Sequence, residues 1–323
     1  MQEHIQELIA YALRLGVSYA DIRTTSQMSQ PIVMRNGQIE SVSVGHDAGI
    51  GCRVLIDGGW GFSSTPSKRY EDYKIMVERA ISIGKASARC KLKDVELSPV
   101  TPVNDCKETT VRKDPFRMPL EDLSNLLKEC HEAMIQIPEV KVTGGSIFMS
   151  REEKVFASSE GAWIEQKLHI TGGGIDCMAR GHGDVQRRSF NMNKTAGFEA
   201  LEGMSLLKRA GEMAEEAKSL LTADSCPAGV DSLILDSSIA RLQVHESCGH
   251  PIELDRVLGS EDTYAGKSFL TPDLFGKQFR FGSPKVTITA DATLPGGLGS
   301  FYYDDEGVPA QRTTMVEEGI FKN

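Results

Sequence analysis

Residues 31–44 of the 323-residue chain have the sequence PIVMRNGQIESVSV, and this stretch decides the fold of the first part of the protein. Apolar residues precede Asn36-Gly37, and apolar residues alternate with polar ones after it. Asn-Gly favours the two positive-φ positions of a tight turn between antiparallel strands. The stretch therefore predicts a β-hairpin, and residues 49–56 predict a third strand that follows it.

Working outward from this hairpin, blocks of predicted helix and strand follow one another along the chain. Apolar residues at three- and four-residue spacing predict helices over residues 2–15, 70–89, 119–136 and 198–221. Residues 140–190 are strand-like, and the proline-containing stretch 91–118 predicts a linker. There is no regular alternation of strand, helix and strand, so a parallel sheet is not expected. The predicted fold class is α+β, an antiparallel sheet with helices.

The segment Cys226-Pro227-Ala228-Gly229 marks a predicted domain boundary. We predict an N-terminal α+β domain over residues 1–225 and a mainly β C-terminal domain over residues 226–323. The second domain is expected to contain one helix over residues 237–249. Its expected strands are residues 230–235, 286–290 and 313–316. Glu318-Gly319 predicts a hairpin turn so close to the last residue that we expect the C-terminal domain to be incomplete in this chain.

The composition is that of an acidic globular protein. The chain has 36 Lys and Arg residues against 45 Asp and Glu residues, which gives a net charge of −9. Such a surface repels nucleic-acid phosphates and anionic lipids, so we expect neither as a partner. No apolar stretch is long enough to span a bilayer. The 7 cysteines contain no CxxC pair, and scattered reduced thiols favour a cytoplasmic protein.

The segment VHESCGHPIE, residues 244–253, contains the candidate metal-binding and catalytic residues. Its two histidines, His245 and His250, are residues of the type that binds zinc, and Glu246 is placed to act as general base on a metal-activated water. The spacing is HExxxH, not the common HExxH. Five residues of a regular α-helix rotate by about 140° and rise about 7.5 Å, so a straight helix would not aim both rings at one ion.

Gly249 and Pro251 offer a way to bring the two rings together. Glycine is permissive and proline disfavours α geometry in the residue before it, so we expect a helix break that swings His250 back. Glu253 or Asp255 is predicted to be a third ligand or a carboxylate that orients an imidazole. The spacing leaves a second interpretation open, a helix end with a hydrogen-bonded histidine and a surface glutamate.

The same segment resembles the HExxxH segment of the TldD/PmbA family of metalloproteases, in its TldD-like branch. Further resemblance lies in the run DSSIARL, residues 236–242, and in GSFYYDDEGVPAQRT, residues 299–313, which is similar to the family's DDEG segment. Residues 316–320 resemble the hairpin that follows it. Residues 49–54 together with Gly61-Phe62 resemble the G-x-G-x-R strand and the turn of the N-terminal domain. The resemblance extends over nearly the whole chain.

This resemblance implies a zinc-dependent protease that cleaves unfolded or extended peptides and works as a homodimer or as a heterodimer with a PmbA-like subunit. It implies that His245 and His250 bind Zn²⁺ and that Glu246 is the catalytic base. The family's third ligand is a cysteine in a later glycine-rich stretch, and Cys248 is not that residue. We therefore expect a C-terminally truncated member that binds zinc weakly.

The sequence allows two roles for three further acidic residues, and it allows two alternative functions for the protein. Asp304, Asp305 and Glu306 are expected either to bind a cation or orient substrate, or to be solvated acids of a turn. The chain could instead be a non-catalytic peptide-binding subunit of a protease dimer, with strand edges that accept an extended peptide. A metal-dependent hydrolase of non-peptide substrates is the third alternative.

Overall fold

The computed structural model describes residues 2–264 and 266–322. Contacts divide the chain into two compact units. Unit 1 contains the chain up to Ala223 together with residues 292–310, and unit 2 contains residues 224–291 and 311–323. Residues 292–310 therefore pack with the N-terminal part, whereas the sequence places them in a domain that begins at residue 226. The domain division at residue 225 stays a prediction, because compactness alone does not show independent folding.

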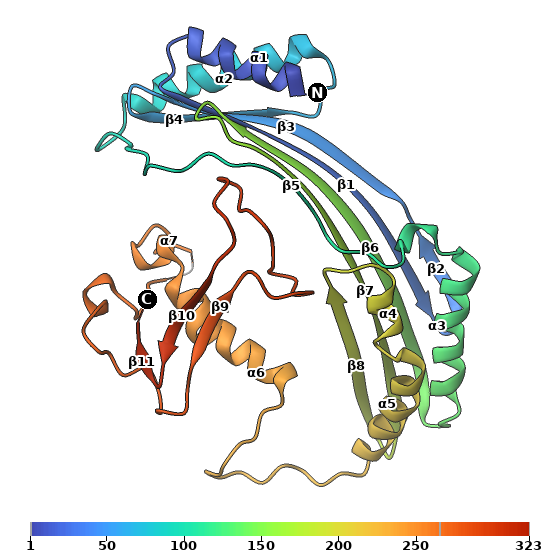
Figure 1. Ribbon diagram of the computed structural model, residues 1–323. Helices are drawn as coiled ribbons and strands as arrows, with labels where there is room; N and C mark the ends of the chain where they lie inside the picture. The colour runs from blue at the N-terminus through green and yellow to red at the C-terminus, as the bar shows by residue number, and fades with distance from the viewer. Residues whose placement is uncertain (1, 265, 323) are drawn as a thin grey trace. The chain divides into compact units, whose positions relative to one another are not determined.

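Unit 1 is built on one eight-stranded sheet (Figure 1). Its strands lie in the order β4-β3-β1-β6-β7-β5, with β2 paired to β1 and β8 paired to β7. The strands are β1 Tyr19–Arg35, β2 Gln38–Val42, β3 Gly45–Ile56, β4 Gly59–Thr65, β5 Asn104–Glu108, β6 Val140–Ser158, β7 Trp163–Gly181 and β8 Asp184–Lys194. All pairs are antiparallel except β5 with β7. The predicted α+β class with antiparallel sheet is confirmed.

The predicted hairpin at Asn36-Gly37 joins β1 to β2. Both turn residues have positive φ, 49° at Asn36 and 76° at Gly37, and Arg35 pairs with Gln38. The prediction of this hairpin is confirmed, because the turn depends on local chemistry that Asn-Gly supplies.

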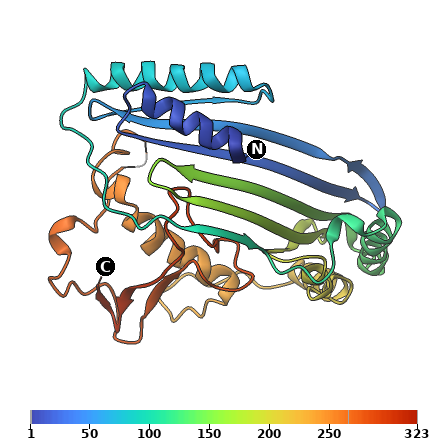
Figure 2. The same ribbon diagram turned by 45° about the horizontal axis from the view of Figure 1, so that its top comes forward.

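Helices cover one face of the sheet in two groups (Figures 1 and 2). They are α1 Gln2–Arg14 and α2 Tyr70–Ala88 at one end, and α3 Leu120–Ile135, α4 Glu199–Glu202 and α5 Leu206–Leu220 at the other. In β1, Ile22 packs in the core beneath α1 and α2, and Ile32 and Met34 pack in the core beneath α3, α4 and α5. Since alternate residues share a face of a strand, both groups lie on the same side, which we call the helix face. The opposite side is the open face, and Asp21 and Arg23 belong to it.

Three local predictions are wrong. The predicted linker 91–118 contains β5, which pairs with a distant strand. The predicted helix 198–221 is divided at Ser205, whose φ of 50° is left-handed. Residues 230–235 form no strand in the described structure, although their apolar composition predicted one.

Unit 2 contains the HExxxH segment and a three-stranded antiparallel sheet. Its elements are α6 Ser237–Val244, a π-helical turn His245–Gly249, a 3₁₀ turn His250–Ile252, α7 Leu254–Val257, β9 Ile288–Asp291, β10 Arg312–Glu317 and β11 Ile320–Phe321. The predicted hairpin between β10 and β11 is confirmed, with Glu318 and Gly319 at φ 48° and 80°. The buried core consists of Cys248, Leu270, Val316 and Phe321.

Two further observations concern the cysteines and the search for a membrane-spanning helix. All seven cysteines are free thiols, and four of them are buried. Over residues 2–264 and 266–322, no helix combines the length and the apolarity needed to cross a bilayer.

Candidate metal centre

Helix α6 leads directly into the HExxxH segment. Asp236 caps its N-terminus, since the carboxylate accepts a hydrogen bond from the Ser238 N–H at 2.7 Å. This bond and the bond from the Ser238 hydroxyl hold the pKa of Asp236 below its usual value. The cap fixes where the helix begins and therefore which residues share its face.

A π-helical turn, and not a kink, brings the two histidines together. The His250 N–H donates to the carbonyl oxygen of His245, five residues earlier. This wider turn compensates for the rotation that a regular helix would impose on a five-residue spacing. The expected break is wrong in its geometry, because Gly249 and His250 both keep right-handed helical angles.

The turn places three side chains of the motif close together. The rings of His245 and His250 lie edge to face with centroids 4.2 Å apart. One ligand atom each from His245, Glu246 and His250 lies within 4.8 Å of the others. The side chains of His245 and Glu246 are 55% and 59% exposed, so the group is open to solvent and to a substrate.

Glu253 contacts the second histidine. His250 Nδ1 lies 3.0 Å from Glu253 Oε1. A carboxylate only accepts hydrogen bonds, so Nδ1 is the donor and Nε2 keeps the lone pair that a metal needs. The orienting role therefore fits Glu253 better than the ligand role. Asp255 belongs to a separate acidic group with Glu253 and Glu261 and does not join the histidines.

The donor types of the cluster fit zinc, since two imidazoles and a carboxylate match its usual ligands. In the part of the chain that the structure describes, no further His, Cys, Asp or Glu joins the group formed by His245, Glu246 and His250. Cys248 is buried in the core of unit 2, and burial raises the pKa of its thiol. Both observations agree with the expectation that Cys248 is not a ligand.

Asp304, Asp305 and Glu306 lie on unit 1 and make local contacts there. Asp304 Oδ1 accepts from the N–H groups of Glu306 and Val308, at 2.8 and 2.9 Å, and so shapes the turn. Asp305 pairs with Lys154 at 3.1 Å. Glu306 pairs with Arg53 at 2.7 Å. The three residues form no candidate metal group among the described residues. Asp304 stabilises the turn, whereas Asp305 and Glu306 pair with basic residues of distant strands.

Sequence reasoning missed two buried polar residues of the open face, Asp21 and Gln166. Asp21 has 0% exposure and lies between Arg23 and Arg53, whose guanidinium groups reach its carboxylate at 3.3 and 2.8 Å. Burial raises the pKa of Asp21, and the two arginines oppose that rise. An acidic residue between the apolar residues Ala20 and Ile22 was the available signal.

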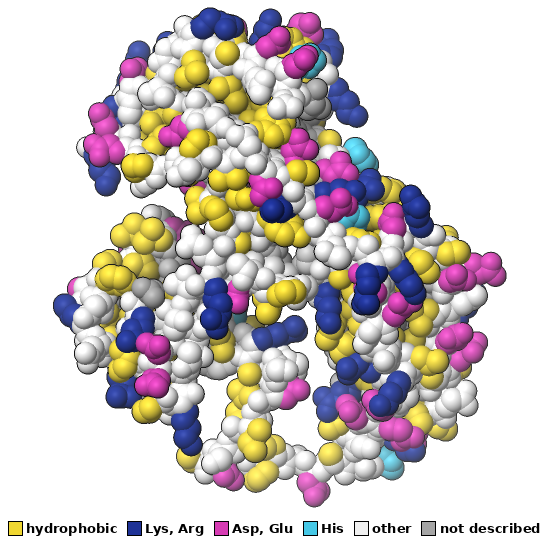
Figure 3. All heavy atoms as spheres, in the orientation of Figure 1, with side chains coloured by type: hydrophobic (Ala, Val, Ile, Leu, Met, Phe, Trp, Pro, Cys, Tyr) yellow, Lys and Arg dark blue, Asp and Glu magenta, His cyan; other side chains and the backbone are white. Residues whose placement is uncertain are grey.

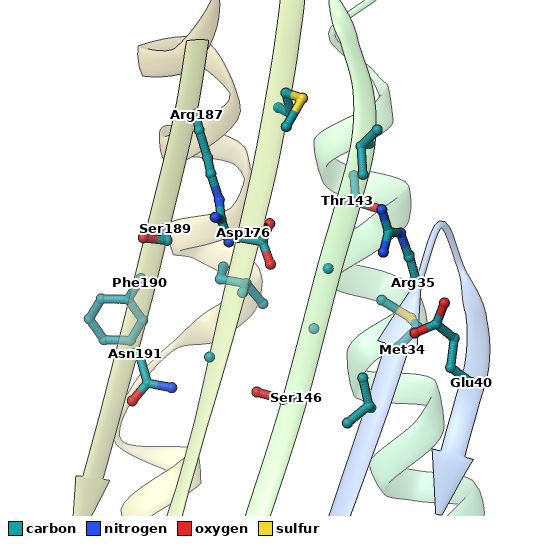
Figure 4. A pocket seen from close by; sticks show the side chains of 17 residues that line it. Met34, Arg35, Glu40, Thr143, Ser146, Asp176, Arg187, Ser189, Phe190 and Asn191 are labelled. Carbon is teal, nitrogen blue, oxygen red and sulfur yellow. Dashed lines mark hydrogen bonds and ion pairs between the residues drawn. The ribbon is translucent and has the colours of Figure 1, made fainter. Parts of the chain in front are cut away.

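A shallow hollow of about 580 Å³ lies elsewhere on the open face (Figure 4). Gly144 and Gly174 line it, and Arg187 reaches toward Asp176, which it contacts at 3.3 Å. Basic and acidic side chains are also interspersed over the visible surface of the molecule (Figure 3). The hollow is a polar sheet surface and contributes no candidate metal group in the described residues.

Paired histidines with an adjacent glutamate on an α+β scaffold define a candidate metallopeptidase. Family models support this class: PmbA/TldA metallopeptidase domain 1 matches residues 20–84, the central domain matches 113–222 and the C-terminal domain matches 228–323. A metalloprotease of Methanocaldococcus jannaschii is 31% identical over 320 residues, which are 98% of this chain and 67% of that protein. The chain belongs to the PmbA/TldD family of metallopeptidases.

Other relatives agree with this assignment. A metalloprotease of Methanothermobacter thermautotrophicus is 30% identical over 94% of this chain and 63% of its own length. A zinc metalloprotease TldD homolog of Saccharolobus solfataricus is 22% identical, over 97% and 66%. The chain thus spans about two thirds of the length of these curated relatives. The crystal structure of TldE from Thermococcus kodakarensis shares the fold, with a TM-score of 0.70 and 19% identity over 99% of this chain and 69% of that one.

Proposed function

We propose that this protein is a zinc-dependent metallopeptidase of the cytoplasm that cleaves unfolded or extended peptides. The observation that carries the proposal is the π-helical turn, which gathers His245, Glu246 and His250 despite their HExxxH spacing. The family, whose members are named metalloproteases, supports the reaction class. The free cysteines support a reducing compartment.

Each residue of the cluster has a distinct task in this proposal. His245 and His250 hold the zinc ion, and Glu253 fixes the ring of His250. Zinc supplies Lewis acidity, which polarises a carbonyl and lowers the pKa of water. A carboxylate oxygen of Glu246 takes the proton of the attacking water and later passes it to the leaving amine. The family resemblance implies a cysteine as third protein ligand.

We also propose that the protein works as a dimer, with a second copy or with a PmbA-like subunit. The shared fold with TldE supports a heterodimer of related chains. The two arrangements are distinguished by analytical ultracentrifugation of the purified chain alone and after mixing with a PmbA-like chain from the same source.

The decisive experiment measures zinc per chain and cleavage of an unfolded, fluorescently quenched protein such as casein. The 323-residue chain is compared with its His245→Ala variant, and His182→Ala, an exposed histidine in the turn after β7, is the control. Zinc that is retained by the parent and the control but lost in His245→Ala supports the metal site. Zinc and cleavage that do not change in His245→Ala would overturn the proposal.

A further inference from the structure

The side chain of Gln166 binds backbone atoms of another part of the chain. This residue lies in β7 and is only 6% exposed. Its Nε2 donates to the Tyr303 carbonyl at 3.0 Å, and its Oε1 accepts from the N–H groups of Tyr303 and Tyr302 at 3.0 and 3.3 Å. The side-chain amide thus binds a peptide group as a neighbouring strand would. Such recognition does not depend on the side chains of the bound segment.

Basic residues beside Gln166 bind the acidic residues that follow Tyr303. Arg53 connects the buried Asp21 to Glu306, with contacts of 2.8 and 2.7 Å. The second arginine, Arg23, lies 3.3 Å from Asp21 and donates to the carbonyl oxygen of Asp305 at 2.7 Å. Asp21 therefore orients two guanidinium groups toward the same turn. The buried carboxylate is tolerated because both partners are charged and hydrogen-bonded.

Residues 302–308, which we call the strap, are held mainly by polar contacts. The side chains of Asp305 and Glu306 are 74% and 62% exposed, so their ion pairs are screened by solvent and individually weak. An apolar approach lies at Gly307, where an added Cβ would be 2.9 Å from the Phe156 ring. A segment held in this way can leave its site without unfolding a hydrophobic core.

Residues of the strap line parts of two hollows of unit 1. One hollow of about 590 Å³ includes Phe62, Phe156 and Asp305 in its lining. The other hollow, of about 630 Å³, includes Leu168 and Tyr302. Both hollows are lined by residues of unit 1.

We propose that the open face carries a docking site for an acidic peptide that forms a tight turn. The site is formed by Gln166, Arg23, Arg53 and Lys154 and is organised by Asp21. Residues 302–308 occupy the site in the chain, and a peptide of the same chemistry displaces them. The backbone contacts of Gln166 and the acidic contacts of the three basic residues carry this inference. The inference does not depend on a metal at His245 and His250.

The experiment uses the full chain with residues 302–308 replaced by a glycine-serine sequence of equal length. The probe is a fluorescein-labelled peptide with the sequence of residues 299–311. We expect saturable binding by fluorescence anisotropy, weakened at least about fivefold by Gln166→Ala, because three hydrogen bonds are lost. High salt and replacement of the peptide's three acids by their amides weaken binding further.

Gln186→Ala is the matched control, since the Gln186 side chain donates to Asp184 in its own hairpin. A folded strap-replaced chain that does not bind the peptide would overturn the proposal, and so would equal weakening by both glutamine variants. If the replacement prevents folding, amide hydrogen exchange of the unaltered chain is measured with and without the peptide to test the displacement. Excess peptide should speed exchange of the Tyr302 and Tyr303 amides, and unchanged protection would contradict displacement.

Discussion

The carbonyl oxygen of His245 accepts the N–H of His250, and this single five-residue hydrogen bond sets the two imidazoles edge to face at 4.2 Å. Glu246 shares the cluster, and Glu253 braces the second ring. These contacts lead to tests that separate peptide cleavage, zinc binding and folding stability.

Replacing Glu246 by Gln should abolish cleavage and keep the metal. The amide cannot take a proton from water, so we expect a loss of about 10²–10⁴-fold in rate, the usual contribution of a general base. Zinc per chain, measured by mass spectrometry after dialysis, should equal that of the parent. A Gln variant that cleaves at the parent's rate would exclude Glu246 as the base.

Glu253→Gln should weaken zinc binding by about 10–100-fold, the usual effect of losing a group that orients a ligand. The neutral amide no longer provides the carboxylate that holds the Nδ1–H of His250. Competition with a fluorescent chelator measures the affinity. Asp255→Asn is the control, because Asp255 accepts from the backbone N–H of Arg256 and lies outside the candidate group of His245, Glu246 and His250. Equal losses in both variants would point to general electrostatics.

Cys248→Ala should lower the stability of unit 2 and leave zinc content unchanged. The thiol is 1% exposed and packs with Val316 and Phe321 in a small core, so its removal leaves a void. Urea unfolding and zinc analysis on the same sample separate the two effects. Loss of zinc without loss of stability would show that the sulfur binds the metal.

Folding stability should fall below about pH 6.5, where unfolded histidine takes up a proton. His169 is 4% exposed, and neither ring nitrogen makes a hydrogen bond to the described part of the chain. Burial, and then Lys167, lower its pKa. The unfolded chain therefore binds more protons as pH falls, and stability decreases until the folded pKa is reached. The urea midpoints at pH 8 and pH 5.5 should differ less for His169→Gln than for the parent, and His182→Gln should match the parent.

Gly61→Ala should be severely destabilising, by roughly 1–3 kcal/mol or more, because added volume in a packed contact forces the backbone apart. A Cβ at Gly61 would lie 2.0 Å from the Ala80 carbonyl oxygen, where β4 meets α2. Gly211→Ala in α5 has nothing within 4 Å and should stabilise by about 0.5–1 kcal/mol. Urea titrations compare the two. Similar midpoints for both variants would contradict the close approach.

What the sequence predicts correctly is chemistry that acts over a few residues. Asn36-Gly37 determines its turn locally, and the apolar periodicity of residues 70–89 is that of α2. The π-helical turn was missed because five-residue hydrogen bonding has no clear residue preference. The parallel pairing of β5 with β7, and the packing of residues 292–310 on unit 1, depend on partners far away in the chain. Local pattern carries no information about such partners.

Asp291 and Arg312 are paired across β9 and β10, although the residues between them pack with unit 1. Anyone who divides this protein for expression must take this excursion into account. A fragment that stops at residue 225 would leave the amide of Gln166 without its partners, and it would remove the contacts of Arg23 with Asp305 and of Arg53 with Glu306. A well-behaved N-terminal fragment would need residues 292–310 supplied by fusion through a linker or as a second polypeptide.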